Sequence, residues 1–291
     1  MKMNVPITFL FDFGQTNDLS RPYIMHEFAA NGAKNLVLCD SLLRQILFDR
    51  TFADRLRTEM ANEGLSFMDA HAVFGKNLDL GCPVPEARGE AIARLKTQLY
   101  VIASMGVHTV TIHTGNETHY PEYDLEVIFD NIKRSLEQIL PLAEELNITV
   151  CIENIWFRIN TPERLLAVKK EFPADALGFC YDAGHANLMK CPTDSADSAP
   201  VMAWKDVTPA WDAHILEKML PHVVNCHLHD NHGNRDEHLN PGNGTVDWNS
   251  IRQLLAQAPR LQVIQSEVIP MRGKIAIRDV CATFRDLFGY L

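Results

Sequence analysis

The chain has 291 residues, of which 46% are hydrophobic, and a formal net charge of −10. It contains no run of eighteen or more uncharged apolar residues, so the composition excludes a membrane-spanning helix and indicates a soluble globular protein. The negative charge works against nonspecific attraction to nucleic acid or to an anionic membrane. Neither is therefore expected as a partner.

The cysteines and the first residues predict a cytoplasmic protein. The seven cysteines are odd in number, form no Cys-x-x-Cys motif, and several lie in apolar, strand-like runs, which indicates buried reduced thiols. The opening stretch MKMNVPITFLFDFGQ has a short apolar run broken by Asp12, which is a poor signal peptide and a good first strand.

Short apolar or β-branched runs recur along the chain, and most are followed by a segment with helical spacing. Strands are predicted over residues 6–11, 35–39, 65–71, 108–113, 148–153, 177–182, 223–229 and 261–267. The clearest helices are predicted over 85–106 and 124–147, and Thr161-Pro162 and Asp247 mark two further helix starts. This alternation predicts the α/β fold class, a (β/α)8 TIM barrel, as a single domain over residues 1–291.

The segment over residues 190–212 departs from this alternation. It follows the sixth predicted strand and mixes Pro, Ser and Asp with two Trp. A loop longer than about 12–15 residues in a compact domain is usually functional or mobile. The segment is either a lid over the site or a tolerated insertion.

Ionisable residues gather where the predicted strands end, most densely in NCHLHDNHGNRDEH over residues 225–238. They are His71, His113, Glu153, Asp182, His185, His227, His229, Asp236, His238 and Glu267. In a parallel barrel these strand ends share one rim. Crowded carboxylates and imidazoles need a neutralising cation, and a divalent metal is the simplest one. A ligand set without Cys suits Zn²⁺ or Mn²⁺ better than Ca²⁺, with Mg²⁺ and Co²⁺ as open alternatives.

Five stretches resemble the xylose isomerase-like TIM barrels, a family that includes sugar isomerases, epimerases and endonuclease IV. They are CIEN (151–154), CYDAGHAN (180–187), HLHDN (227–231), DEHLNPGNGTVDW (236–248) and QSEV (265–268). Their order and spacing run through almost the whole chain and are specific. The resemblance implies one metal held by Glu153, Asp182, His227 and Glu267.

The same resemblance leaves the number of metals open. Endonuclease IV has two further metals, whose ligands match His71 and His113 for one and His185, Asp236 and His238 for the other. Sugar isomerases of the family often use such histidines to hold substrate hydroxyls around one metal. We expect one tightly bound metal.

The leading interpretation is a metal-dependent sugar isomerase or epimerase that moves a proton through a cis-enediolate, with Glu153 and Glu267 as base and acid. The loops after His71 and His113 contain one Lys and no Arg, which argues against a groove for nucleic acid phosphates. The stretch ENIWFRIN lacks the lysine of hydride-shifting aldose isomerases, which favours proton transfer. An endonuclease IV-like phosphodiesterase (AP endonuclease) and a keto-polyol dehydratase or lyase are the alternatives.

The expected partner is a small-molecule carbohydrate. The side chains predicted to contact it are His71, His113, Trp156, Arg158, His185, His229 and Arg235. The sequence names neither the sugar nor its phosphorylation state. It also leaves the oligomeric state open, with a homo-oligomer among the alternatives.

Overall fold

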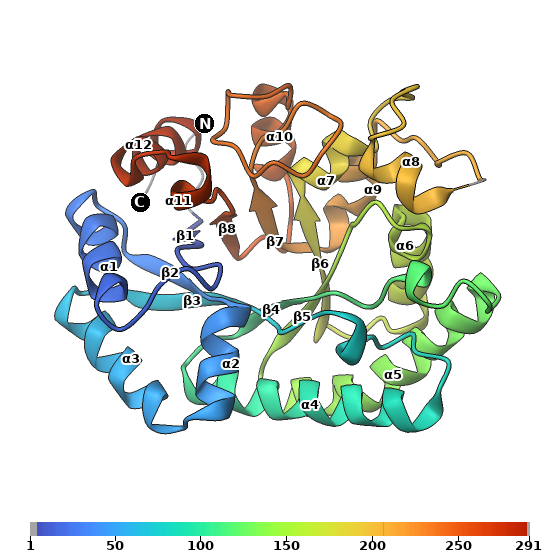
Figure 1. Cartoon of the computed structure of the whole chain (residues 1–291), viewed down its shortest axis with the longest axis horizontal. Coiled ribbons are helices and arrows are strands. Elements are labelled where there is room, and N and C mark those ends of the chain that lie inside the picture. The colour runs from blue at the N-terminus through green and yellow to red at the C-terminus, as the bar shows by residue number, and fades with distance from the viewer. Residues whose placement is uncertain (1–4, 206, 290–291) are drawn as a thin grey trace.

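The computed structural model describes residues 5–205 and 207–289; the predicted domain extends to residues 1–4, 206 and 290–291, which lie outside the described part. Eight parallel strands form a closed barrel in sequence order (Figure 1). They are β1 Ile7–Phe9, β2 Asn35–Leu38, β3 Ser66–His71, β4 Thr109–Ile112, β5 Thr149–Glu153, β6 Leu177–Asp182, β7 Val223–Leu228 and β8 Val263–Ser266. The predicted TIM barrel is therefore confirmed.

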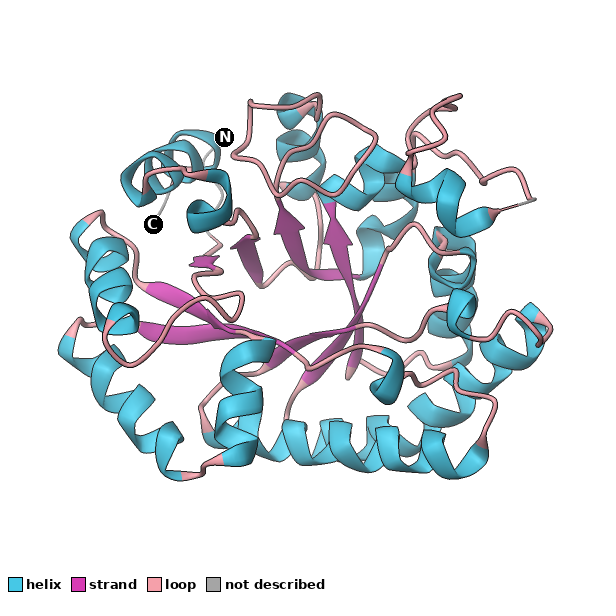
Figure 2. Ribbon diagram, viewed as in Figure 1, coloured by secondary structure: helices cyan, strands magenta, loops and turns pink. Residues whose placement is uncertain are grey.

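Helices surround the barrel (Figure 2). They are α1 Ser20–Ala30, α2 Asp40–Phe48, α3 Thr51–Asn62, α4 Pro85–Ser104, α5 Leu125–Glu145, α6 Pro162–Glu171, α7 Ala183–Leu188, α8 Ala199–Trp204, α9 Ile215–Met219, α10 Trp248–Leu255, α11 Pro270–Gly273 and α12 Ile277–Phe288. Four 3₁₀ turns add η1 Lys76–Leu78, η2 Glu117–His119, η3 Arg158–Asn160 and η4 Leu220–His222. Among the described residues, no helix is both long and apolar enough to cross a membrane.

Both predicted helix starts are confirmed. Pro162 is the first residue of α6, where its missing N–H costs nothing because that group would have no partner inside the helix. Asp247 caps α10, and its carboxylate accepts the N–H of Ser250 at 3.1 Å.

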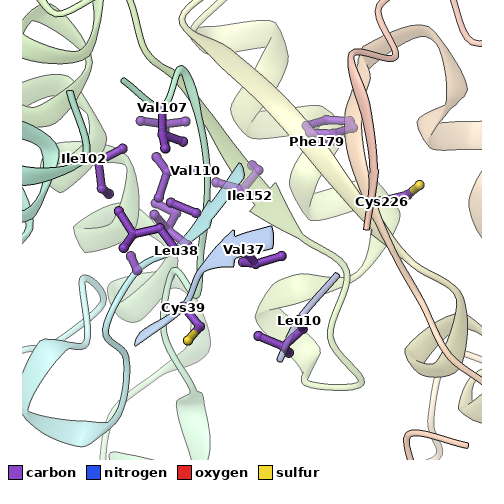
Figure 3. Close-up of a cluster of buried hydrophobic side chains, with 14 of the residues drawn as sticks. Leu10, Val37, Leu38, Cys39, Ile102, Val107, Val110, Ile152, Phe179 and Cys226 are labelled. Atoms are coloured by element: carbon purple, nitrogen blue, oxygen red, sulfur yellow. The ribbon is translucent and has the colours of Figure 1, made fainter. Parts of the chain in front are cut away.

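The alternation of side chains along each strand separates the core from the site. Val110 of β4 and Ile152 of β5 are fully buried and belong to the same hydrophobic cluster as Ile102 of α4 (Figure 3). Their neighbours Thr111 and Glu153 point the other way, into the barrel, where each contacts His227 of β7. The helix layer thus buries one face of the strands and leaves the other free for polar side chains.

Of the described residues in the segment 190–212, Ala199–Trp204 form α8. The indole N–H of Trp204, the last residue of α8, donates to the carbonyl of Trp156 at 2.7 Å. This bond attaches α8 to the loop after β5.

Candidate metal centre

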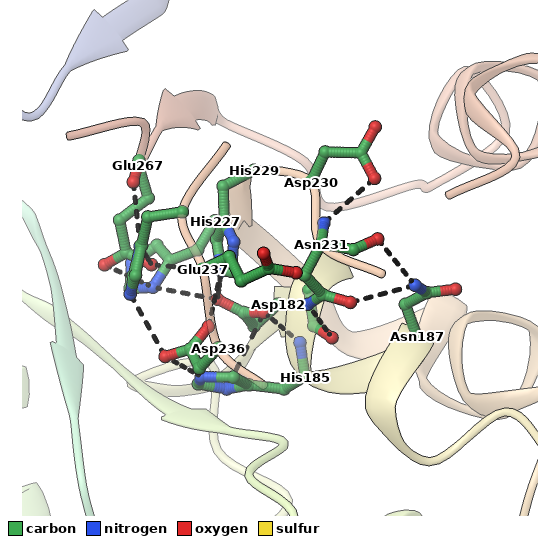
Figure 4. Close-up of polar contacts among 12 residues, drawn as sticks. Asp182, His185, Asn187, His227, His229, Asp230, Asn231, Asp236, Glu237 and Glu267 are labelled. Atoms are coloured by element: carbon green, nitrogen blue, oxygen red, sulfur yellow. Dashed lines mark hydrogen bonds and ion pairs between the residues drawn. The ribbon is translucent and has the colours of Figure 1, made fainter. Parts of the chain in front are cut away.

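His227 of β7 lies among three carboxylates at the carboxyl end of the barrel. Its Nδ1 is 3.0 Å from Oε1 of Glu153, 3.3 Å from Oε1 of Glu267 and 3.9 Å from Oδ2 of Asp182. All four side chains are buried, and they come from β5, β6, β7 and the residue after β8. Figure 4 shows Asp182, His227 and Glu267 among their polar neighbours. The structure thus brings together the four residues that the resemblance assigned to one metal.

The other ring nitrogen of His227 faces the interior of the barrel. Nε2 is 3.2 Å from the hydroxyl oxygen of Thr111, which also accepts a hydrogen bond from the amide of Asn225 at 2.9 Å. A metal bound through Nδ1 requires the ring proton on Nε2, and Thr111 lies where it can accept that N–H. The surroundings of His227 therefore suit Nδ1 as the ligand atom.

The charges of the cluster also fit a cation. Burial and the nearby charges of Asp182, Glu153 and Asp236 raise the pKa of Glu267 well above its usual range. Burial alone would raise the pKa of Glu153 too, but the imidazoles of His227 and His113 hold it well below its usual value. A bound divalent ion would relieve the repulsion among these carboxylates.

Two buried carboxylate oxygens at the site have no hydrogen-bond partner within the described residues, Glu153 Oε2 and Asp236 Oδ1. Glu153 Oε2 lies 3.0 Å from His113 Nε2, but their orientation makes no hydrogen bond. Unpaired buried oxygens are costly, and metal coordination is one way to satisfy them. The donor set, nitrogen and oxygen without sulfur, fits a divalent metal.

The remaining predicted ligands surround this centre. His71 groups with Glu153 and His227, His185 groups with Asp182 and His229, and Asp236 and His238 group with His229, each set having ligand atoms within 4.8 Å of one another. His113 adjoins Glu153 as described. All nine predicted metal ligands therefore belong to one connected cluster, which leaves room for either one metal or several.

His229 was predicted to contact substrate, and the structure places it fully buried, with Nε2 3.3 Å from Oδ2 of Asp182. A Cβ on Gly184, at the start of α7, would lie 2.0 Å from the His229 ring. Only glycine lets α7 pass so close to β7, so the backbone there is fitted to this imidazole.

The loop after β7 is held by Asp230, which is fully buried. Its Oδ1 accepts the N–H groups of Asn231 and Val246, and its Oδ2 accepts those of Gly242 and the Trp248 indole, at 2.8–3.1 Å. This fixes the loop that carries Asp236 and His238. Their carboxylate and ring then meet at 3.0 Å.

A cavity of about 400 Å³ opens over the cluster. Its floor includes His71, His113, Glu153, His185, Asp236, His238 and Glu267, and its walls include Phe13, Phe74, Trp156 and Phe157. Among the predicted substrate contacts, His71, His113, Trp156 and His185 line this cavity. His229, Arg158 and Arg235 are not among its lining residues.

The two arginines lie elsewhere. Arg158 borders a separate pocket with Tyr123 and Trp204. Arg235 is exposed and pairs with Asp197 at 3.3 Å. Neither position gives a direct contact with a molecule in the main cavity.

Sequence reasoning missed a second polar pair in the cavity. Nδ1 of His119, in the 3₁₀ turn η2, lies 2.9 Å from Oδ2 of Asp79, and both residues line the cavity. Asp79 follows β3 and His119 follows β4. The shared rim of neighbouring parallel strands was the available signal, but no spacing links two residues 40 positions apart.

Comparisons with known proteins agree with this architecture. A family model described as xylose isomerase-like TIM barrel matches residues 29–267. The uncharacterised protein y4fM of Sinorhizobium fredii is 25% identical over 223 residues, covering 69% of this chain but 65% of that protein. The chain thus matches slightly less than two thirds of the length of this relative.

Solved structures cover nearly the whole chain. A D-tagatose 3-epimerase-like protein superposes with a TM-score of 0.73 at 20% identity, covering 99% of this chain and 98% of that one. The D-psicose 3-epimerase of Clostridium cellulolyticum H10, solved with D-tagatose, gives 0.69 at 15% identity, with 99% of both chains covered. The IolI protein, solved with a zinc atom, gives 0.70 at 16% identity, with 100% of this chain and 99% of that one covered. At these identities the likeness shows the fold.

Proposed function

Since the chain belongs to the xylose isomerase-like TIM barrel family, we propose that it is a divalent-metal-dependent isomerase or epimerase of a sugar or sugar derivative. The observation that carries the proposal is the convergence of Glu153, Asp182, His227 and Glu267 next to a cavity of about 400 Å³. That volume is typical of small-molecule sites. Structural neighbours named as a D-tagatose 3-epimerase-like protein and a D-psicose 3-epimerase support the same class.

Glu153, Asp182, His227 and Glu267 would hold the metal. When bound, a divalent metal supplies Lewis-acid stabilisation of the negative charge that grows on the substrate oxygen as the α-proton leaves. Zn²⁺ or Mn²⁺ suits the mixture of imidazole and carboxylate donors best, with Co²⁺ and Mg²⁺ next.

Glu153 and Glu267 would carry the proton. Both carboxylates line the cavity, and they enter it from two different strands, β5 and the end of β8. One carboxylate removes the proton next to the carbonyl to give a cis-enediolate, and the other returns a proton to that intermediate. His71, His113 and His185 line the same floor and would orient the substrate hydroxyls.

The cavity favours an unphosphorylated substrate. Its lining includes five carboxylates, those of Asp40, Asp79, Glu153, Asp236 and Glu267, and no Lys or Arg among the described residues. A phosphate group carries up to two negative charges and is normally bound by such cations. We therefore propose a free ketose or related keto-polyol as the substrate.

The same charge distribution weighs against the phosphodiesterase alternative. The nine-residue cluster has the residue types for three metals, as in endonuclease IV, but a nucleic acid groove normally adds basic side chains. The dehydratase or lyase alternative begins with the same loss of an α-proton and differs only in its product.

The test follows the proton. The metal-loaded protein is incubated with D-psicose, D-fructose or D-tagatose in deuterated water, and deuterium is expected at the carbon next to the carbonyl. Glu153→Gln and Glu267→Gln should each lower this exchange by a factor of about 10² or more. Metal content is measured in the same samples, because Gln is a poor metal ligand. Sugar turnover without solvent label, or cleavage of abasic DNA with no sugar turned over, would contradict the proposal.

A further inference from the structure

We infer that His119, held by Asp79, accepts a hydrogen bond from the terminal hydroxyl group of the substrate and so selects polyhydroxy over deoxy sugars. The inference rests on the proposed function, because it concerns the end of the substrate that does not react. The polar pair of Asp79 and His119 lines the cavity. Among the described residues, it is the one ion pair of this lining that lies outside the cluster of predicted metal ligands.

Hydrogen bonds fix the carboxylate of Asp79, which in turn orients the imidazole of His119. This carboxylate is buried, with Oδ1 accepting the N–H of Gly81 at 2.9 Å and Oδ2 accepting the N–H of Asn116 at 3.0 Å. The Nδ1 of His119 completes the set at 2.9 Å from Oδ2. Two backbone donors therefore fix the carboxylate before it meets the ring.

The backbone around Asp79 is fitted to this carboxylate. A Cβ on Gly115 would lie 2.3 Å from Oδ1 of Asp79, well inside van der Waals contact. Only glycine leaves room for the acid here. Gly115 belongs to the loop after β4 and Asp79 to the loop after β3, so the close approach joins the two loops that form this part of the cavity.

The pairing decides which ring nitrogen can bind substrate. Because Asp79 accepts at Nδ1, that nitrogen carries the hydrogen, and Nε2 of the neutral ring is left as an acceptor. Nε2 has no hydrogen-bond partner within the described residues, and the side chain is 26% exposed. A hydroxyl group can donate to it, whereas a carboxylate or a phosphate without hydrogens cannot.

His119 lies in the cavity but outside the cluster of side chains that would hold the reacting end of the sugar. The proton-transferring carboxylates Glu153 and Glu267 mark the reacting end, and His119 shares their cavity without pairing with either of them among the described residues. Apolar side chains, Leu78 and Phe157, line the cavity with it. An oriented acceptor is left without a partner when the matching hydroxyl is missing, so it discriminates against a substrate that lacks that hydroxyl.

The test compares each ketose with its 6-deoxy form. We measure kcat and KM for D-psicose, D-fructose, D-tagatose and their 6-deoxy counterparts. In the unmodified protein, KM of the 6-deoxy form should exceed that of the parent sugar about tenfold, the usual worth of one good hydrogen bond. In His119→Leu the two KM values should agree within about twofold, because KM of the parent sugar rises to that of its 6-deoxy form.

The matched control is His26→Leu. His26 also pairs with a carboxylate at 2.9 Å, that of Glu63, but it lies on α1 and outside the cavity lining. This variant should keep the tenfold ratio. Asp79→Asn is a second probe. A side-chain amide has one oxygen, so it cannot accept all the hydrogen bonds that Oδ1 and Oδ2 of Asp79 now accept, and the KM ratio should fall in this variant too.

The outcomes separate the two proposals. Equal loss of kcat on parent and 6-deoxy sugars, with the KM ratio kept, would mean that His119 only supports the structure, and this inference would be wrong while the proposed function stands. If His119→Leu does not fold, Asp79→Asn decides by the same ratio. If the unmodified protein turns over none of the sugars, the proposed function fails and the inference fails with it.

Discussion

Asp69 of β3 is a buried carboxyl group with a raised pKa. It is fully buried inside the barrel, where the Thr109 hydroxyl donates to it at 2.6 Å and the Asn225 amide at 2.9 Å. Burial raises the pKa of Asp69 to about 6 despite these hydrogen bonds. Asn225 also donates to Thr111, which contacts His227, so Asp69 is connected to the candidate metal centre by side chains alone.

The raised pKa of Asp69 predicts that its contribution to the free energy of unfolding falls as the pH rises. The unfolded chain loses the proton of Asp69 near the ordinary aspartate pKa of 3.8, while the raised pKa of the folded protein keeps the proton up to about pH 6. The contribution of Asp69 to the free energy of unfolding is therefore constant below pH 4 and falls between about pH 4 and pH 6. The elevation from 3.8 to about 6 corresponds to roughly 3 kcal/mol.

Asp69→Asn removes the titration but keeps the size. Its unfolding free energy, measured by urea titration at each pH relative to the unmodified protein, should rise by roughly 3 kcal/mol between pH 4 and pH 7. A difference that does not vary with pH would show that Asp69 titrates normally in the folded protein.

Among the elements, the loop over residues 231–247 is held by one buried side chain, Asp230. Asp230→Asn would place an amide against N–H groups that now donate to a carboxylate, leaving buried donors unpaired. We expect the free energy of unfolding to fall by roughly 3 kcal/mol, together with weaker metal binding because Asp236 and His238 lose their support. Glu237→Gln is the control, since Glu237 accepts from the exposed His232 in the same loop. It should cost less than about 1 kcal/mol.

The strands could be predicted from the sequence because each is short, apolar and followed by a helical pattern. The predicted strands that end at His229 and Glu267 are each one residue too long at the carboxyl end, since these residues follow the last residues of β7 and β8. Glu153 and His227 were correctly predicted to lie close together, because the carboxyl ends of all the parallel strands meet at one rim of the barrel. Contacts between loops could not be predicted: Asp79 meets His119 only because Gly115 lets two loops approach, which no periodicity encodes.

At the scale of the whole molecule, the two ends of the barrel have opposite electrostatic character around β6. At its amino end the ammonium group of Lys169 donates to the carbonyls of Pro173, Ala174 and Leu177 at 2.7–3.1 Å. At its carboxyl end Asp182 joins the metal-centre cluster. The cation Lys169 therefore satisfies backbone carbonyls at one end, while the other end gathers carboxylates whose repulsion the neighbouring imidazoles reduce and a bound cation would reduce further.

The proposed metal should consequently stabilise the entire barrel, because its four ligands come from β5 to the end of β8 and a bound ion joins half of the strands. With Zn²⁺ or Mn²⁺ at about one hundred times its Kd, the stabilisation should be about 2.7 kcal/mol. For a chain of this size that corresponds to a rise in Tm of roughly 4–5 °C over the chelated protein. His227→Ala removes the central ligand and should melt at the same temperature with and without the ion. The rise should also vanish toward acid pH, since the ligands bind metal only when deprotonated. A Tm that metal leaves unchanged, or an equal rise in His227→Ala, would show that the ion does not bind at this centre.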